Sequence, residues 1–168
     1  QDFINTHGLK LIRNDSWSGS SFCYTGYGNT DCSHSSSFIY RYRTLKNEGF
    51  FEKNEIDTVL VFGGTNDSWS NAPLGEPMYE NWKEEDLFNV LPAICHFAYS
   101  LKTDFPHIKV VFIINEWLKP EVQDCIEAAA IRFGATPVRL RNNVSKENNH
   151  PTAAGMKQIS EQLTEALK

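Results

Sequence analysis

The sequence predicts an α/β protein with three layers, α/β/α, in which helices cover both faces of a parallel sheet. Segments 56–62 and 108–115 are short, β-branched and apolar throughout, which is typical of strands buried on both faces. Segments with helical spacing separate the predicted strands, and such alternation favours parallel pairing. The 168 residues suffice for one domain with a sizeable core, and no repeat or linker indicates a second domain.

The N-terminal part begins with a helix end and a strand. Residues 3–8, FINTHG, are typical of the last turn of a helix that a glycine ends. Segment 9–14, LKLIRN, is predicted to be a strand, and the segment from 16 to 34 is a polar loop. Serine caps and helical spacing of apolar residues then predict a helix over 35–49, before the strand at 56–62.

The C-terminal part continues the alternation. Pro92 lies inside a helical pattern, where we expect it to kink the helix. A loop as long as 68–82, with Pro, Gly and aromatic residues, is typical of a functional lid or rim. The predicted elements after segment 56–62 are loop 68–82, helix 87–101, strand 108–115, helix 120–134, strand 136–142 and helix 151–168.

Composition and charge exclude several classes of protein. The formal net charge is −5, which argues against a nucleic-acid binder, because phosphate contacts need a basic face. No apolar run approaches the roughly 18 residues of a membrane span. The sequence opens on QDFINTHG without an initiator Met, which indicates a processed, trimmed or partial product.

Four cysteines allow two interpretations. Cys23 and Cys32 flank a polar loop and can pair if the protein is exported. Cys95 and Cys125 lie in apolar helical patterns, which favours buried thiols. The stretch DCSH, residues 31–34, has side chains that can ligate a metal, but it lacks the second group of ligands that a metal site needs. We therefore expect a polar loop there and no metal site.

Residues that follow the strands are the first place to search for chemistry, because ligands of parallel sheets bind at the carboxyl ends of strands. His150 lies in such a segment, directly before Pro151, the expected first residue of the last helix. Glu147 precedes His150 by three residues across two asparagines, which tolerate a tight turn. A carboxylate so placed can orient the imidazole as a general base. A solvated loop with an incidental His and Glu is an equal alternative.

Asn66 follows the most strongly predicted strand in the stretch FGGTND. The two glycines allow a sharp turn, and the Asn66 amide can then point over the sheet edge as an oxyanion donor. One alternative is an ordinary turn between a strand and a loop. Another is a phosphate-binding loop, which is disfavoured because no Lys follows and no helix start is evident.

Together these motifs resemble the SGNH hydrolase superfamily, also called GDSL-type esterases and lipases. GGTND resembles its third block, in which the Asn is an oxyanion donor, and ENNHP resembles its last block, with an acid three residues before the histidine. The resemblance covers residues 14–156 and is closest to a branch found in gut Bacteroidetes. Glu147 departs from the Asp that is usual in the family, and its side chain is one methylene longer.

The stretch NDSWSGSS fits this family in two registers. In one, Asn14 to Ser16 replaces the Gly-Asp-Ser nucleophile block, and Ser16 attacks the substrate. In the other, Asn14 and Ser18 to Ser21 match the second block, in which Gly19 donates its backbone N–H to the oxyanion. The helix end before segment 9–14 favours the second register, in which the nucleophile lies upstream of Gln1.

The resemblance also implies a missing strand. The family has a flavodoxin-like sheet of five strands, whereas the sequence predicts four, and the first family strand is central. We therefore expect residues 1–168 to form a single SGNH hydrolase-like domain without its first strand. Such a domain leaves strand edges exposed unless a preceding segment or another chain fills the gap.

The resemblance implies serine esterase chemistry without metal or organic cofactor. His150, oriented by Glu147, deprotonates a serine that attacks an ester carbonyl, while Gly19 and Asn66 hold the oxyanion. Trp69, Tyr79 and Trp82 are expected to line the substrate side. Their rings suit sugars, so the expected substrate is a small-molecule or carbohydrate ester, with acetylated carbohydrate favoured; simple packing of the loop is an equal alternative.

Two other functional classes stay open. The chain is a catalytically inactive carbohydrate-binding or interaction module if it has no nucleophile. It binds flavin or nucleotide if the sheet is that of a phosphate-binding flavodoxin-like domain. The resemblance to the Bacteroidetes branch and the cysteine content favour an exported bacterial protein, periplasmic or extracellular.

Overall fold

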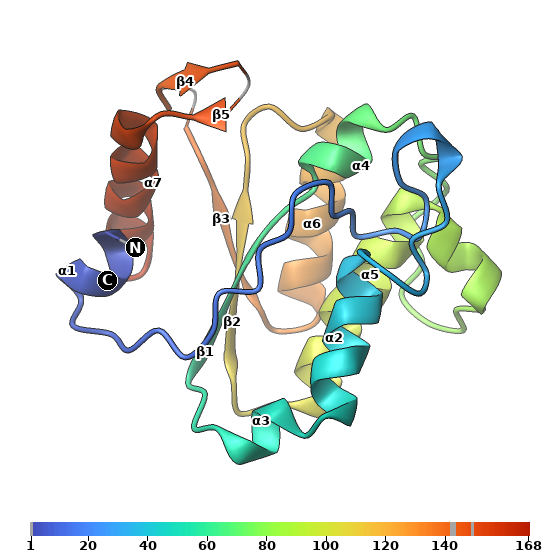
Figure 1. The fold of residues 1–168 in the computed structure, drawn as a ribbon, viewed down its shortest axis with the longest axis horizontal. Coiled ribbons are helices and arrows are strands. Elements are labelled where there is room, and N and C mark those ends of the chain that lie inside the picture. The colour runs from blue at the N-terminus through green and yellow to red at the C-terminus, as the bar shows by residue number, and fades with distance from the viewer. Residues whose placement is uncertain (1, 142–143, 149) are drawn as a thin grey trace.

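A computed structural model describes residues 2–141, 144–148 and 150–168. It confirms the predicted three-layer α/β architecture, with helices on both sides of a parallel sheet (Figure 1). The helices are α1 (Asp2–Thr6), α2 (Phe38–Asn47), α3 (Phe50–Lys53), α4 (Thr65–Trp69), α5 (Val90–Asp104), α6 (Pro120–Arg132) and α7 (Ala153–Ala166), with short 3-10 helices η1 (Tyr27–Asn29) and η2 (Glu84–Phe88). The strands are β1 (Thr58–Phe62), β2 (Lys109–Ile114), β3 (Thr136–Arg139), β4 (Lys146–Glu147) and β5 (His150–Pro151).

The main sheet has the order β1-β2-β3, and both pairings are parallel. Leu60 lies opposite Val111, and Ile113 lies opposite Val138. The central strand β2 is buried from Val110 to Ile114, which is the reason for its unbroken apolar sequence. β4 and β5 form a separate antiparallel hairpin between β3 and α7.

Two hydrophobic cores lie on opposite faces of the sheet. On one face, residues of α2, α5 and α6 pack on alternate side chains of the strands, such as Val61, Val110 and Phe112. On the other face, Ile159 and Leu163 of α7 pack on the remaining β2 and β3 side chains, and α1 packs on α7. Figure 1 shows α7 and α1 on one side of the sheet and α2, α5 and α6 on the other.

Local capping explains where several helices begin. The Ser37 hydroxyl accepts a hydrogen bond from the Tyr40 backbone N–H, as expected for a serine cap of α2. α5 has no side-chain cap; instead, the carbonyls of Pro73 and Leu74 in the preceding loop accept hydrogen bonds from its first backbone N–H groups. Among the described residues, no helix has both the length and the apolar character that crossing a membrane requires.

The prediction of a strand at 9–14 was wrong. These residues form no regular secondary structure, and Leu9 and Leu11 are each 51% exposed. β1 is consequently an edge of the described sheet, and its Leu60 and Phe62 side chains are 38% and 39% exposed. No described strand pairs with the apolar residues of 9–14.

Three helix boundaries also differ from the predictions. Pro92 lies in the first turn of α5, where its missing N–H has no helical partner, so it does not kink the helix. Pro151 belongs to β5, and α7 instead begins after Thr152, whose hydroxyl accepts from the Gly155 N–H. A helix, α4, does start within GGTND, although no helix start was evident from the sequence. The start was not evident because the N-cap residue is Gly64, which has no polar side chain to mark it.

Candidate active site

The turn between β1 and α4 forms the first part of the candidate site. Gly64 has a φ of +94°, a conformation that other residues rarely adopt. A Cβ on Gly63 would lie 2.6 Å from ring atoms of Phe38, so this position also requires glycine. The glycine pair therefore makes the sharp turn that the sequence predicts, and Asn66 follows in the first turn of α4.

The segments that carry the two predicted oxyanion donors meet beside this turn. The Asn66 side-chain amide donates a hydrogen bond of 2.7 Å to the Ser20 carbonyl. Ser20 directly follows Gly19, whose φ of +78° creates the bend and whose position is exposed. The amide nitrogen has two hydrogens, so a second donor stays available to a ligand. Asn66 and the Gly19 segment thus lie together at the carboxyl end of β1.

Asp67 of α4 also anchors this loop, a role that the sequence did not predict. Its fully buried carboxylate accepts backbone hydrogen bonds from Phe22, at 3.0 Å, and from Cys23, at 3.1 Å. Burial raises the pKa of Asp67, while these hydrogen bonds act in the opposite direction. Burial is also the main cause that raises the pKa of the Cys23 thiol, and the neighbouring Asp67 carboxylate raises it further. Asp67 therefore anchors the loop that carries Gly19 to α4.

Arg41 of α2 holds the outer side of this loop. Its guanidinium donates to the Ser20 hydroxyl at 2.9 Å and forms an ion pair with Asp15. It also lies 5.4 Å from the ring centre of Trp17, whose side chain is 63% exposed. The sequence analysis did not single out Arg41 or Trp17, because a contact between a helix and a distant loop leaves no local pattern.

Ser16 lies in a tight turn at the start of this loop. Asn14 Oδ1 accepts hydrogen bonds from the Ser16 backbone N–H, at 3.1 Å, and from its hydroxyl, at 2.8 Å. Ser16 is exposed. Among the described residues, no hydrogen bond joins the Ser16 hydroxyl to a histidine. The structure therefore does not bring Ser16 and His150 into hydrogen-bonding contact.

His150 and Glu147 face each other across the β4–β5 hairpin, where they are paired by their Cα positions. Asn148 makes the turn with a φ of +48°, as expected for asparagine in a tight turn. Both His150 and Glu147 are exposed, and no hydrogen bond joins their side chains in the described part of the chain. The pairing places Glu147 and His150 opposite each other, without a side-chain hydrogen bond among the described residues that fixes the ring.

The hairpin is attached to its surroundings on two sides. Thr152 donates its backbone N–H to the Ser145 carbonyl at 3.0 Å and its hydroxyl to the Ser145 hydroxyl at 2.9 Å. A Cβ on Gly155 would lie 2.0 Å from the Ser145 carbonyl oxygen, so α7 packs closely here. Lys146 lies 4.2 Å from the ring centre of Trp117, in the segment that follows β2. The hairpin is thereby held at the carboxyl ends of the strands.

The three predicted substrate-lining aromatics lie in different places. Trp69 ends α4 and is 39% exposed. Tyr79 packs on Phe133, at the C-terminal end of α6, and Trp82 packs on α5. Because α6 runs from the carboxyl ends of the strands towards their amino ends, Tyr79 lies away from Asn66. This placement of Tyr79 and Trp82 favours the alternative in which they pack the loop.

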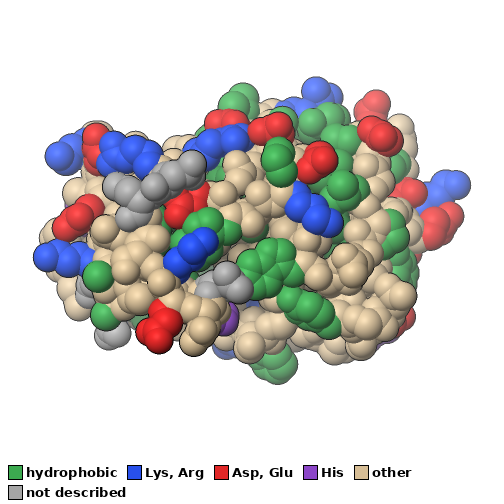
Figure 2. Space-filling model, turned by 90° about the horizontal axis from the view of Figure 1, so that it is seen from above, with side chains coloured by type: hydrophobic (Ala, Val, Ile, Leu, Met, Phe, Trp, Pro, Cys, Tyr) green, Lys and Arg blue, Asp and Glu red, His purple; other side chains and the backbone are tan. Residues whose placement is uncertain are grey.

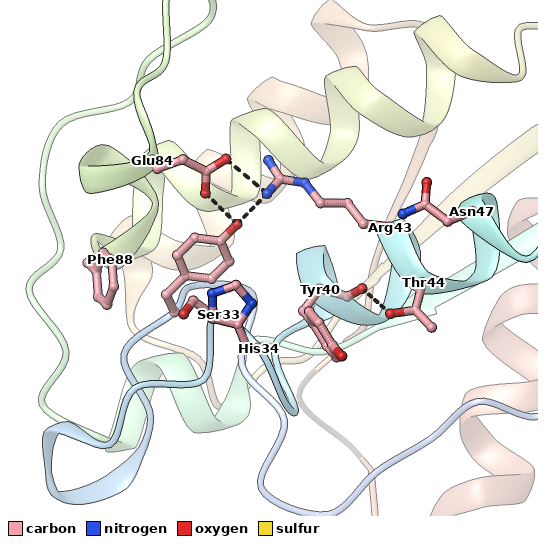
Figure 3. A pocket seen from close by; sticks show the side chains of 9 residues that line it. Ser33, His34, Tyr40, Arg43, Thr44, Asn47, Glu84 and Phe88 are labelled. Carbon is pink, nitrogen blue, oxygen red and sulfur yellow. Dashed lines mark hydrogen bonds and ion pairs between the residues drawn. The ribbon is translucent and has the colours of Figure 1, made fainter.

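Figure 2 views the end of the molecule that carries the candidate site, where hydrophobic and charged side chains and a histidine reach the surface. A cavity of about 550 Å³ lies elsewhere, between α2, η2 and the loop before α2 (Figure 3). In its wall, Arg43 pairs with Glu84 at 2.9 Å and donates to the Tyr24 hydroxyl at 2.8 Å, so these groups satisfy one another. None of the predicted catalytic or oxyanion residues lines this cavity.

Comparison with known proteins relates the whole chain to one family. The family model described as GDSL-like lipase/acylhydrolase matches residues 1–167. A GDSL-like lipase from Bacteroides uniformis is 38% identical with a TM-score of 0.89, over 99% of this chain and 73% of that chain. A GDSL-like lipase from Bacteroides ovatus is 32% identical with a TM-score of 0.87, over 99% of this chain and 75% of that chain.

A more distant structure shares the fold alone. A protein from Lactobacillus plantarum is 18% identical with a TM-score of 0.73, over 98% of this chain and 84% of that chain. No curated protein matches the sequence.

Proposed function

This chain belongs to the GDSL-like lipase/acylhydrolase family, and on that premise we propose that it is an ester hydrolase whose oxyanion hole contains Gly19 and Asn66. The observation that carries the proposal is the hydrogen bond from the Asn66 amide to the Ser20 carbonyl, at the carboxyl end of β1. It supports a single position at which the free N–H of that amide and the Gly19 backbone N–H both face a substrate carbonyl.

His150 is the proposed general base. It takes the proton of a serine hydroxyl as that hydroxyl attacks the ester carbonyl, and it later protonates the leaving alcohol. Glu147 is the proposed acid that orients His150, supported by their pairing across the hairpin. Both are exposed, so we propose that a hydrogen bond between their side chains forms when substrate covers the site.

The nucleophile is proposed to come from outside residues 1–168. Ser16 takes part in the turn that begins at Asn14, and its hydroxyl donates a hydrogen bond to Asn14 Oδ1. The position of Gly19 beside Asn66 supports the register in which NDSWSGSS supplies an oxyanion donor and not the attacking serine.

The unpaired edge of β1 supports the proposal that the first strand of the family's sheet pairs there. Its outer edge pairs with no described residue, and Leu60 and Phe62 are more exposed than is usual for a buried sheet. Leu9, Leu11 and Ile12 are exposed as well. A parallel strand between residues 9–13 and β1 would pair the free backbone groups of β1. Since parallel strands end at the same edge, its last residue would lie beside Asn66.

The proposed substrate is an acyl ester on a carbohydrate, with acetyl esters favoured. The exposed rings of Trp17 and Trp69, on the loop before Gly19 and at the end of α4, support this class. Aromatic faces that stay open to solvent suit the apolar faces of sugar rings.

A fluorophosphonate probe tests the proposal, because it labels only an activated serine. We expect no labelling of the 168-residue chain and strong labelling of a form that includes the preceding segment. Labelling of the 168-residue chain that Ser16→Ala abolishes would overturn the upstream nucleophile and leave the esterase proposal intact. No labelling of either form, together with binding of acetylated oligosaccharides, would instead identify an inactive binding module.

A further inference from the structure

We propose that Cys95 and Cys125 form a disulfide bond that joins α5 to α6 when the protein is in an oxidising compartment. Their sulfur atoms lie 3.7 Å apart, on adjacent helices and 30 positions apart in the sequence. Both side chains are buried in the core between the helices. This proposal is independent of the proposed esterase activity.

The arrangement of these two thiols differs from that of the other cysteines. All four cysteines are free thiols in this structure. The Cys23 and Cys32 thiols instead donate to backbone carbonyls of their own loop, those of Thr25 and Thr30. The sequence left a pairing of Cys23 with Cys32 open, and this structure does not pair them. The two helix cysteines are the pair whose sulfur atoms point at each other.

The loop before η2 contacts Cys95. The Met78 backbone forms a hydrogen bond with the Cys95 sulfur, and the next residue, Tyr79, lies under the Arg132 guanidinium at 4.6 Å. The Cys125 thiol, as hydrogen-bond donor, is the main cause that lowers the pKa of Cys95, and the Arg132 charge lowers it further. Hydrogen bonding to Cys95 and burial raise the pKa of Cys125. Cys95 is therefore the better first nucleophile of the two.

The chemistry is ordinary thiol–disulfide exchange. The Cys95 thiolate attacks one sulfur of an oxidant disulfide, such as glutathione disulfide or an oxidised thiol oxidoreductase, and a mixed disulfide forms as one oxidant thiolate leaves. Cys125 then loses its proton and attacks Cys95 Sγ, which releases the second oxidant thiolate. The two cysteines lose two electrons and two protons in total, and one oxidant disulfide is reduced to two thiols.

The cross-link would act on the helices that support the aromatic loop. It closes a chain segment that contains most of α5, all of β2 and the start of α6, and it removes conformations from the unfolded chain. It also fixes the surface on which Tyr79 and Trp82 pack. Disulfides persist in secreted and periplasmic proteins, so the cross-link fits the exported location that the sequence favours.

The test is oxidation of the folded 168-residue chain with glutathione disulfide at mildly alkaline pH. We expect the mass to fall by two hydrogens, and we expect a non-reducing digest to contain one cross-linked species with Cys95 and Cys125. The Tm should rise by roughly 5–10 °C, and dithiothreitol should reverse the rise. Cys95→Ala should abolish the mass loss and the rise, whereas the matched control Cys23→Ala should leave both unchanged.

Three results would overturn the proposal. These are a stable glutathione adduct at Cys95 without release, a cross-link between Cys23 and Cys32 instead, or full alkylation of Cys95 and Cys125 after prolonged oxidation of the folded protein. The digest of the unmodified sequence decides among them, so the test does not depend on whether an alanine variant folds.

Discussion

The Asn66 side-chain amide and the Ser20 carbonyl are joined by a hydrogen bond of 2.7 Å between α4 and the loop that contains Gly19. Their sequence positions are 46 residues apart, so the contact exists only because β1 and this loop converge at one end of the sheet. The bond sets the plane of the amide and leaves one N–H for a ligand. The Asn66 side chain therefore makes a structural contact and also supplies the proposed catalytic donor.

Replacing Asn66 should reduce turnover more than substrate binding. In a form of the protein that the fluorophosphonate probe labels, we expect Asn66→Ala to lower kcat by about 10²- to 10³-fold with KM little changed, because the lost N–H acts mainly on the oxyanion of the transition state. Steady-state hydrolysis of p-nitrophenyl acetate measures both constants. Asn66→Asp, which keeps the shape without the donor, should lose as much, and a variant with normal kcat would refute the assignment.

Replacing Asp67 should loosen the same loop. Asp67→Ala leaves the backbone N–H groups of Phe22 and Cys23 without their buried acceptor. We expect the free energy of unfolding to fall by about 1–3 kcal/mol, measured by urea denaturation at pH 7. The exposed Asp57 offers a matched control, since Asp57→Asn should change stability by less than about 0.5 kcal/mol. Equal stability of the two variants would show that Asp67 does not anchor the loop.

The sequence predicted the features whose backbone geometry depends on local spacing. Gly63 and Gly64 were predicted from their turn chemistry, and His150 and Glu147 from a three-residue separation that a hairpin brings face to face. Such features are encoded within a few residues. They could be predicted because the backbone geometry that they require is itself local.

Features that depend on distant partners were missed or wrong. The apolar alternation of 9–14 indicates a strand only if a neighbouring strand supplies hydrogen bonds, and no described residue does so. Arg41 of α2 and Asp67 of α4 contact the loop. These partners are too far apart in the sequence for a local pattern to indicate the contact. Tyr79 and Trp82 were expected to line the substrate side or to pack the loop, and their contacts with α6 and α5 favour the second.

Removing His150 should abolish hydrolysis without unfolding the protein. The side chain is exposed, and no described contact makes it part of the core. We expect His150→Ala to remove nearly all esterase activity and to leave Tm within about 2 °C of the parent, because surface substitutions change stability little. His107→Ala is the matched control, since His107 is exposed before the first residue of β2, at the other end of the sheet. Activity retained by His150→Ala would remove the residue from the mechanism.

His96 should make the fold less stable in mild acid. Burial lowers the pKa of His96 from 6.5 to about 4; the Arg43 charge adds to the effect, while Glu84 and Asp104 oppose it. Its Nδ1 atom is buried and has no hydrogen-bond partner in the described part of the chain, and its ring lies 5.4 Å from that of Trp82 in an edge-on arrangement. Between pH 6.5 and about 4, the unfolded chain therefore binds a proton that the folded protein does not, so this stability is present above pH 6.5 and is lost as the pH falls.

The variant His96→Phe isolates this effect, because it keeps an aromatic ring and cannot titrate. We expect the stability of the parent relative to His96→Phe to fall by up to about 3 kcal/mol between neutral pH and pH 4, since each unit of pKa shift corresponds to about 1.4 kcal/mol. Urea denaturation of both proteins at a series of pH values measures the difference, and the carboxylates common to both cancel. A difference that is independent of pH would mean that His96 titrates alike in the folded and unfolded states.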